Sequence, residues 1–295
     1  MKKVFRWIGI VLGGILGLIL IAAIILFVSA SFRLNKVYTI RAESLTFPSD
    51  PASIAHGGHL AGIYCTGCHG NTYGGKSVFS SPALGAIFAL NLTPGQGGAG
   101  REFTDANWVL AVRHGINPEG KPLVVMPSKD ISNFSDADFE AIIAYLKSVP
   151  AVDEEWPDPV MTPLGKILLA TGAFGDALNV ETIDHNKLHP AAPPAGASAA
   201  YGEYLVKAFG CTTCHGKDYS GGRSPNPAAP PAPDLTRGGT VGKWTDLDFI
   251  NTMRSGVTPS QHKLTDFMPW KDLNHMTDDE LKAVWLYLQS LPSKK

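Results

Sequence analysis

The stretch Cys65-Thr66-Gly67-Cys68-His69-Gly70 occurs a second time as Cys211-Thr212-Thr213-Cys214-His215-Gly216. Further matching segments follow each copy in the same order. They are residues 91–93 with 234–236, 103–108 with 244–249, Arg113 and Gly115 with Arg254 and Gly256, Met126-Pro127 with Met268-Pro269, and 141–150 with 283–292. A preserved order of this kind indicates a duplicated structural module. We therefore expect two domains, at residues 50–150 and 201–295.

Each copy has the sequence pattern of helices joined by loops. Asp50-Pro51 predicts the start of a first helix, because Asp is a good N-cap and Pro suits the first helical position. Thr104 and Thr245 predict the start of a middle helix, and Ser135 and Thr277 the start of a last one. Thr277 and Glu280 have the spacing of a capping box. Since no stretch alternates convincingly between apolar and polar residues, we predict an all-α fold class without strands.

The pattern C-x-x-C-H is the attachment signature of c-type haem. Its two thiols form thioethers with the haem vinyl groups, and the adjacent histidine donates the proximal nitrogen to the iron. Cys65 and Cys68 would thus bind one haem and Cys211 and Cys214 another, which uses all four cysteines. A lone C-x-x-C is also found in redox pairs and zinc sites. The histidine after both pairs favours two covalent haem c groups, with His69 and His215 as iron ligands.

The sixth iron ligand is predicted by comparing the two copies. Of the six methionines, Met126 and Met268 are the pair at equivalent positions, each before a proline. A thioether is a soft donor that suits haem iron. The alternatives are that these methionines fill gaps in the core, or that His262 or His275 binds the second iron.

The sequence gives weaker indications of the roles of other polar residues in the repeat. Arg113 and Arg254 occupy matching positions and are candidate partners of haem propionates, because guanidinium groups pair well with carboxylates. A role in a surface turn is the alternative for both. His56 and His59 precede the first motif and are interpreted as polar surface or loop residues rather than iron ligands.

The amino terminus predicts a membrane anchor at residues 1–36. No charged residue occurs between Trp7 and Phe32, and about 20 apolar residues suffice to cross a bilayer. Lys2, Lys3 and Arg6 precede this run and place the amino terminus in the cytoplasm by the positive-inside rule. The alternative is a signal sequence cleaved after Ala30, although the apolar run is longer than signal sequences usually have.

The charge distribution excludes a nucleic-acid partner. The net charge is −1, and residues 1–36 hold five basic residues and no acidic one. The rest of the chain has 20 basic and 26 acidic residues, so it lacks the positive field that binds a phosphate backbone. Residues 151–200 form a linker that begins acidic and ends rich in Pro and Ala, as semi-rigid spacers do. Its apolar part, from Leu164 to Val180, predicts a packed helix.

The combination of these motifs resembles the multihaem cytochrome c subunits of bacterial periplasmic alcohol and gluconate dehydrogenases. The resemblance covers about 200 residues. It implies two class I cytochrome c domains, with His69 and Met126 on one iron and His215 and Met268 on the other. Those subunits usually carry three haem modules and no long amino-terminal helix, so this chain departs from them in both respects.

From the motifs and the resemblance together we expect an electron carrier that is not itself an enzyme. It would lie in the inner membrane with its haem domains on the periplasmic side, and pass single electrons. Its partners would be redox proteins: a periplasmic dehydrogenase, a quinol-oxidising complex or a terminal oxidase. The alternative is a dihaem enzyme of the peroxidase or thiosulfate-oxidising type, which would need an open or unusual ligand at one iron.

Overall fold

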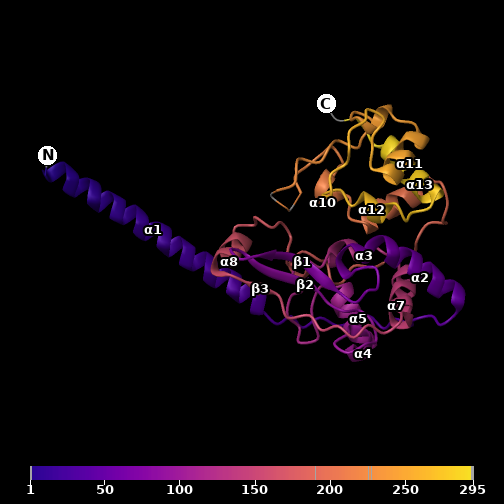
Figure 1. Ribbon diagram of the computed structural model, residues 1–295, viewed down its shortest axis with the longest axis horizontal. Helices are drawn as coiled ribbons and strands as arrows, with labels where there is room; N and C mark the ends of the chain where they lie inside the picture. Colours follow the sequence, from indigo (N-terminus) through magenta and orange to yellow (C-terminus); the bar gives the residue numbers. More distant parts are fainter. Residues whose placement is uncertain (1, 190, 225, 227, 294–295) are drawn as a thin grey trace.

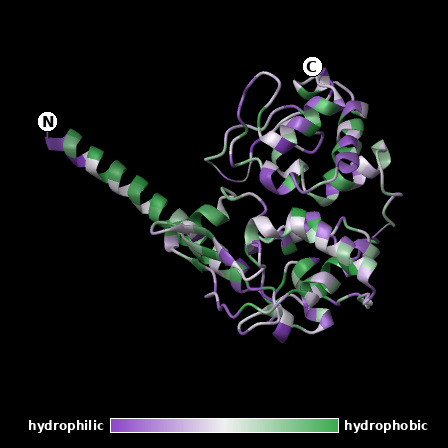
Figure 2. Cartoon of the chain, turned by 45° about the vertical axis from the view of Figure 1, so that its right-hand side comes forward, coloured by the Kyte–Doolittle hydropathy of each residue, from purple (hydrophilic) through white to green (hydrophobic). Residues whose placement is uncertain are grey.

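The computed structural model describes residues 2–189, 191–224, 226 and 228–293. Its first element, α1 (Lys2–Asn35), is a continuous helix of 34 residues that projects away from the other elements (Figure 1). At a rise of 1.5 Å per residue the helix is roughly 50 Å long. Among the described residues it is the one helix long and apolar enough to cross a membrane. Figure 2 shows that the ribbon of this helix is coloured as hydrophobic over most of its length.

Two helical modules follow, and their elements correspond one to one. The first module contains α2 (Pro51–Tyr64), α3 (Thr66–His69), α4 (Ala99–Glu102), α5 (Asp105–Val112), α6 (Ser128–Ile131) and α7 (Asp136–Ser148). The second contains α9 (Ala199–Ala208), α10 (Thr212–His215), the 3-10 helix η2 (Val241–Lys243), α11 (Asp246–Ser255), α12 (Trp270–Leu273) and α13 (Asp278–Ser290). The predicted helical fold class is confirmed.

The predicted helix starts are also confirmed. In each case the N-cap side chain accepts a hydrogen bond from the backbone N–H three residues later, which satisfies a donor that the helix leaves free. The N-caps are Asp50, Thr104, Ser135, Thr245 and Thr277. Thr277 and Glu280 form the expected reciprocal capping box.

The first and last helices of each module cross at a glycine. A Cβ atom added at Gly57 of α2 would lie 1.9 Å from the carbonyl oxygen of Ala141 in α7. A Cβ atom added at Gly202 of α9 would lie 1.9 Å from the carbonyl oxygen of Ala283 in α13. Both contacts involve backbone, which cannot rotate away. Glycine therefore sets the distance between these helices in both modules.

We expect Gly57→Ala to destabilise the protein by about 3 kcal/mol, because the methyl group must push two packed helices apart. Gly62→Ala in the same helix is the matched control, since nothing lies within 4 Å of its Cβ position. That control should be neutral or stabilising by up to about 1 kcal/mol through helix propensity. Chemical denaturation of both variants measures the difference. Equal stabilities would contradict the assigned crossing.

The prediction that no strands occur is wrong. A small antiparallel sheet of order β1-β2-β3 consists of β1 (Lys76–Ser81), β2 (Gly85–Ala89) and β3 (Val160–Met161). A bulge between Ser77 and Phe79 interrupts the pairing of β1 with β2. The strands lack alternation because the faces of β1 are both largely exposed, and β3 comes from the linker, about 70 residues further along the chain. Pairing of this kind leaves no periodic signal in the sequence.

The linker is packed against other elements over much of its length. The Asn91 side chain donates hydrogen bonds to the carbonyls of Val152 (2.7 Å) and Glu154 (3.0 Å). The indole N–H of Trp156 donates to the carbonyl of Gly74 at 2.9 Å. This half of the linker is thus attached to the first module.

The predicted helix from Leu164 to Val180 is shorter than expected. It consists of α8 (Pro163–Ala170) and the 3-10 helix η1 (Asn179–Glu181). α8 ends at Ala170, and Gly172 and Gly175 follow with φ angles of +77° and +58°, a left-handed conformation that does not continue a helix. α8 packs on the carboxyl-terminal part of α1, and the Arg33 Nε donates to Glu181 at 2.9 Å.

Candidate haem-binding sites

Both C-x-x-C-H motifs form one turn of helix. The His69 N–H donates to the carbonyl of Cys65 at 2.8 Å, and the His215 N–H donates to that of Cys211 at 3.0 Å. Gly70 and Gly216 follow with φ angles of +75° and +79°, a conformation that favours glycine. The turn brings each pair of thiols and the following imidazole together, and all four cysteines are free of disulfides.

Each motif histidine is buried and oriented by a backbone carbonyl. His69 Nδ1 lies 2.8 Å from the carbonyl oxygen of Leu90, and His215 Nδ1 lies 2.9 Å from that of Pro233. With Nδ1 donating, Nε2 carries the free lone pair, as in metal-binding histidines generally. Burial lowers the pKa of both histidines, although the carbonyls partly oppose this. The neutral imidazole is the form that binds iron.

Met126 and Met268 lie in turns of the same geometry. Each precedes a proline, with φ/ψ of −81°/47° at Pro127 and −77°/46° at Pro269. The Met126 carbonyl accepts from Ser128 N–H at 2.9 Å, and the Met268 carbonyl accepts from Trp270 N–H at 2.8 Å. Both methionines are partly buried against the core. The two turns are thus equivalent in structure as well as in sequence.

The competing residues have different surroundings. Met253 and Met276 are buried core residues with 6% and 3% exposure. His262 and His275 are exposed, and the His262 backbone forms a turn with Thr258. These positions favour Met268 over the two histidines as a ligand of the second iron.

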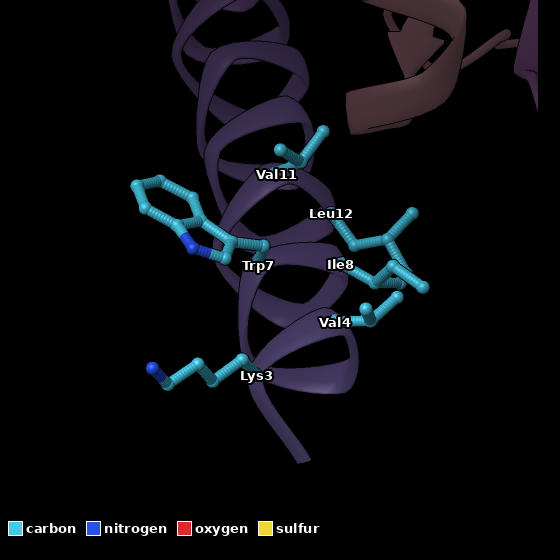
Figure 3. A pocket seen from close by; sticks show the side chains of 6 residues that line it. All are labelled: Lys3, Val4, Trp7, Ile8, Val11 and Leu12. Atoms are coloured by element: carbon cyan, nitrogen blue, oxygen red, sulfur yellow. The ribbon is translucent and has the colours of Figure 1, made fainter. Parts of the chain in front are cut away.

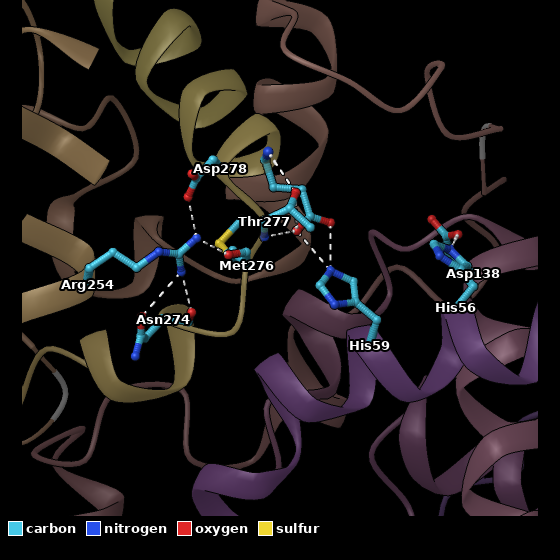
Figure 4. Close-up of polar contacts among 9 residues, drawn as sticks. His56, His59, Asp138, Arg254, Asn274, Met276, Thr277 and Asp278 are labelled. Carbon is cyan, nitrogen blue, oxygen red and sulfur yellow. Dashed lines mark hydrogen bonds and ion pairs between the residues drawn. The ribbon is translucent and has the colours of Figure 1, made fainter. Parts of the chain in front are cut away.

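The two arginines of the repeat fix the loop before the last helix. Arg113 is fully buried, donates to Asp136 Oδ1 at 2.7 Å, and lies over the ring of Phe139. Arg254 donates to the Met276 carbonyl (2.7 Å) and to Asp278 Oδ1 (2.6 Å) (Figure 4). Asp136 and Asp278 each begin a last helix. These contacts give both arginines a structural role that does not depend on a propionate.

Several buried N–H groups have no hydrogen-bond partner among the described residues. They are Trp108 Nε1, Arg113 Nε, Trp270 Nε1 and Trp285 Nε1. Leaving such a donor unpaired costs about 1–3 kcal/mol each. A haem brings two carboxylates that accept hydrogen bonds. The thiols, the oriented imidazoles, the thioethers and these free donors together fit a bound haem in each module.

Both attachment motifs lie at the module interface, which we define as the contacts of α2, α3, α6 and α7 with α9, α10, α12 and α13. An aromatic cluster occupies its centre. Tyr64 lies beside Phe209 with ring centroids 5.8 Å apart, and Phe134 lies 5.7 Å from Phe209. Tyr64 directly precedes Cys65, and Cys65 and Cys211 pack against the same continuous core. The haem attachment points are therefore close to one shared apolar region.

Polar contacts across the module interface are reciprocal. His59, two residues after Gly57, lies with Nε2 2.9 Å from Glu280 of the second module (Figure 4). Tyr204, two residues after Gly202, donates to Asp138 of the first module. Asp138 and Glu280 occupy the same position in their helices, three residues before the alanines that contact the glycines. Each module thus gives an aromatic donor and a carboxylate to the other.

A second reciprocal pair lies beside the attachment turns. Thr213 Oγ1, inside the second motif, donates to Asp130 Oδ2 of α6 at 3.2 Å. At the equivalent position in the first motif, a Cβ atom on Gly67 would lie 2.7 Å from Asp272 Oδ2 of α12. Burial raises the pKa of Asp130 to about 6. These aspartates come four residues after Met126 and Met268, so each methionine turn contacts the attachment turn of the other module.

His56 and His59, interpreted from the sequence as polar surface or loop residues, are partly exposed, and each also forms an ion pair with a buried carboxylate. His56 Nε2 lies 2.7 Å from Asp138 Oδ1 within the first module. The sequence did contain a signal for these ion pairs. Asp138 and Glu280 are acidic residues on the buried side of the last helix of each module, where they are 9% and 6% exposed. A buried carboxylate requires a partner.

We expect the His56–Asp138 pair to be most stabilising between about pH 3.8 and 6.5. The hydrogen bond to Asp138 raises the pKa of His56 above its ordinary 6.5, so its contribution disappears as the pH rises through that raised value. Burial alone would raise the pKa of Asp138, but bonds from His56 and Tyr204 lower it below 3.8, so its contribution disappears on acidification.

Urea unfolding of wild type and His56→Gln at several pH values measures this. The stability difference should be largest inside that window and shrink on either side. A difference independent of pH would contradict the ion pair.

Each helical module matches a known protein family. Residues 199–292 match the cytochrome c family, and residues 52–146 match the family described as cytochrome c oxidase, cbb3-type, subunit III. The chain carries two cytochrome c domains. The two cytochrome c domains coincide with the helical modules and imply two haem c groups, which confirms the predicted cofactor.

Relatives of the cytochrome c domains occur as subunits of dehydrogenases. The chain is 29% identical to the cytochrome c subunit of a quinone-dependent alcohol dehydrogenase from Gluconacetobacter polyoxogenes, over 88% of its own length and 62% of the relative. It is 28% identical to the gluconate 2-dehydrogenase cytochrome c subunit from Pantoea cypripedii, over 78% and 57%. It is 25% identical to the fructose dehydrogenase cytochrome subunit from Gluconobacter japonicus, over 82% and 53%. The chain thus spans about three fifths of these relatives, and the predicted resemblance is confirmed.

Proposed function

We propose that this chain is a membrane-anchored dihaem cytochrome c that transfers single electrons between redox proteins outside the cytoplasm. The observation that carries the proposal is the equivalence of two complete ligand sets, each with two thiols, an oriented histidine and a methionine turn. His69 and Met126 would hold the first iron, and His215 and Met268 the second. A site with both axial positions filled suits electron transfer better than substrate binding.

The chain's own residues would control the redox chemistry in three ways. A haem c held at each site supplies a one-electron couple between ferric and ferrous iron. The Leu90 and Pro233 carbonyls fix the histidine rings, and the methionine thioethers favour the ferrous state. The buried core around both motifs keeps water away.

The module interface supports direct transfer between the two haems. Cys65 and Cys211 pack on one aromatic cluster, and the reciprocal contacts hold both attachment turns in a fixed relative position. An electron that enters one module can therefore reach the other without a separate docking event. This geometry makes the two modules a single electron-transfer unit.

The amino-terminal helix would anchor this unit in the inner membrane. Lys3 and Trp7 lie on the first turns of α1, beside Val4, Ile8 and other apolar side chains (Figure 3). Tryptophan and lysine are typical of the membrane–water boundary, and the basic residues favour a cytoplasmic amino terminus. The haem modules, which follow α1, would then lie on the periplasmic side.

The relatives suggest the source of the electrons. Their names describe cytochrome subunits of alcohol, gluconate and fructose dehydrogenases. By analogy, the partner of this chain would be a periplasmic dehydrogenase, with a quinol-oxidising complex or a terminal oxidase as further redox partners. The chain would carry electrons for such a complex without catalysing the oxidation of its substrate.

A potentiometric titration combined with ligand binding tests the proposed function. The purified holoprotein should take up one electron per haem reversibly, and its oxidised spectrum should be low-spin at both irons. Cyanide and hydrogen peroxide should leave that spectrum unchanged. A high-spin iron that binds cyanide and turns over peroxide would show a dihaem enzyme instead.

A further inference from the structure

The elements that lie beside α1 form a second apolar surface, which the haem sites do not explain. α8 packs along α1, where Ala30, Leu169, Ala177 and Leu178 form a small buried core. The β1–β2 turn lies directly under α8. Thr162 N–H donates to the Leu84 carbonyl at 3.2 Å. We call α8, β3 and the β1–β2 hairpin the α8–hairpin face.

The residue count along α1 gives the level of α8 relative to the bilayer. If Trp7 marks one boundary of the bilayer core, the roughly 20 residues needed to cross it end near Phe27. The side of α1 that other elements partly cover begins at this level, with Ala23, Leu26, Phe27 and Ala30. Lys166 of α8 has its ammonium 5.1 Å from the centre of the Phe27 ring. α8 therefore lies at the level where the acyl chains end and the phosphates begin.

The composition of the α8–hairpin face fits that level. Leu164 and Val160 are 48% and 60% exposed, and Phe79 on β1 is 39% exposed. No charged residue occurs in 77–100, and Lys166 is the one charged residue in 159–175. Figure 2 shows hydrophobic ribbon beside the carboxyl-terminal end of α1. An apolar surface with a single lysine at phosphate level is typical of segments that lie in a membrane interface.

The α8–hairpin face is an addition to the shared module. Among the described residues at the corresponding place in the second module, an isolated bridge between Gly222 and Ala232 replaces the hairpin. The haem chemistry, which both modules share, thus does not require this face.

We propose that the α8–hairpin face lies in the interfacial layer of the same lipid bilayer that α1 crosses. Leu164 and its apolar neighbours contact acyl chains, and Lys166 contacts lipid phosphates. This inference rests on the proposed anchoring by α1. It adds that the first module is held flat against the lipid at a fixed orientation, instead of hanging from a single helix.

Photocrosslinking of the full-length holoprotein to lipid tests the inference. The protein is reconstituted into vesicles of phosphatidylethanolamine and phosphatidylglycerol, with p-benzoylphenylalanine in place of Leu164, Leu18 or Leu188. Leu18 of α1 and Leu188 of the linker are 69% and 89% exposed. Leu18 tests the anchor, and Leu188 is the matched exposed control. An unchanged haem spectrum shows that each variant is folded.

We expect lipid adducts from Leu164 in a yield close to that from Leu18, and none from Leu188. Adducts from Leu18 without adducts from Leu164 would overturn the inference and leave the anchor in place. Adducts of Leu164 with a second copy of the chain would overturn it as well. Absence of adducts from Leu18 would overturn the anchoring and the inference with it.

Discussion

Replacing Met268 with alanine should remove about half of the near-infrared charge-transfer band of the oxidised protein, because a methionine sulfur on ferric iron produces that band and two haems contribute. The potential of the second haem should fall, since the thioether favours ferrous iron. The iron that loses its ligand should also bind cyanide. Near-infrared absorption and a redox titration measure these changes. Met126→Ala should have the same effect on the first haem.

Buried methionines that lack a role at the iron provide the controls. Met253→Leu and Met276→Leu change core residues of the same module and should leave the band unchanged. A full band in Met268→Ala would contradict the assignment. His262→Ala and His275→Ala would then identify the ligand, because both histidines lie in the same region of the second module.

Replacing Cys65 and Cys68 together with alanine should remove one of the two covalent haems. Thioether bonds retain haem through acid extraction, and the first module has no other cysteine. Pyridine haemochrome per chain should therefore fall from two haems to one. Beyond the cofactor, the first module should lose stability, because Trp108 and Arg113 would keep their unpaired buried N–H groups.

The equivalent double variant of the second motif tests whether losing one haem affects only its own module or the whole protein. Cys211→Ala with Cys214→Ala should also leave one haem, now in the first module. Two haems in either double variant would contradict covalent attachment by these thiols. Loss of both haems in one variant would show that the modules do not mature independently.

The sequence predicted well those features that depend on short segments. The repeat defined both modules, and N-caps such as Asp50 and Thr277 placed the helix starts, because these signals involve residues within four positions of each other. The C-x-x-C-H motifs likewise predicted the haem sites from local spacing. Family comparison confirmed the two domains.

Features that depend on distant partners were not predicted. β3, which pairs with β2, comes from the linker about 70 residues further along the chain, and His59 contacts Glu280, which is more than 200 residues away in the sequence. Arg113 was a candidate propionate partner because Arg254 occupies the matching position. The structure gives another reason for the match, since each arginine pairs with the aspartate that begins the last helix of its module. A repeated residue thus indicates a shared role without telling which one.

The reciprocal contacts also bear on the ancestry of the chain. In a symmetric dimer, residue i of one subunit contacts residue j of the other, and the converse contact also occurs. Asp138 with Tyr204 and Glu280 with His59 follow this rule inside a single chain. They have the form of a twofold dimer of single-haem subunits that gene duplication joined. The symmetry is incomplete: histidine and tyrosine occupy the equivalent positions 59 and 204, and among the described residues of the second module the isolated bridge between Gly222 and Ala232 stands where the first module has its hairpin.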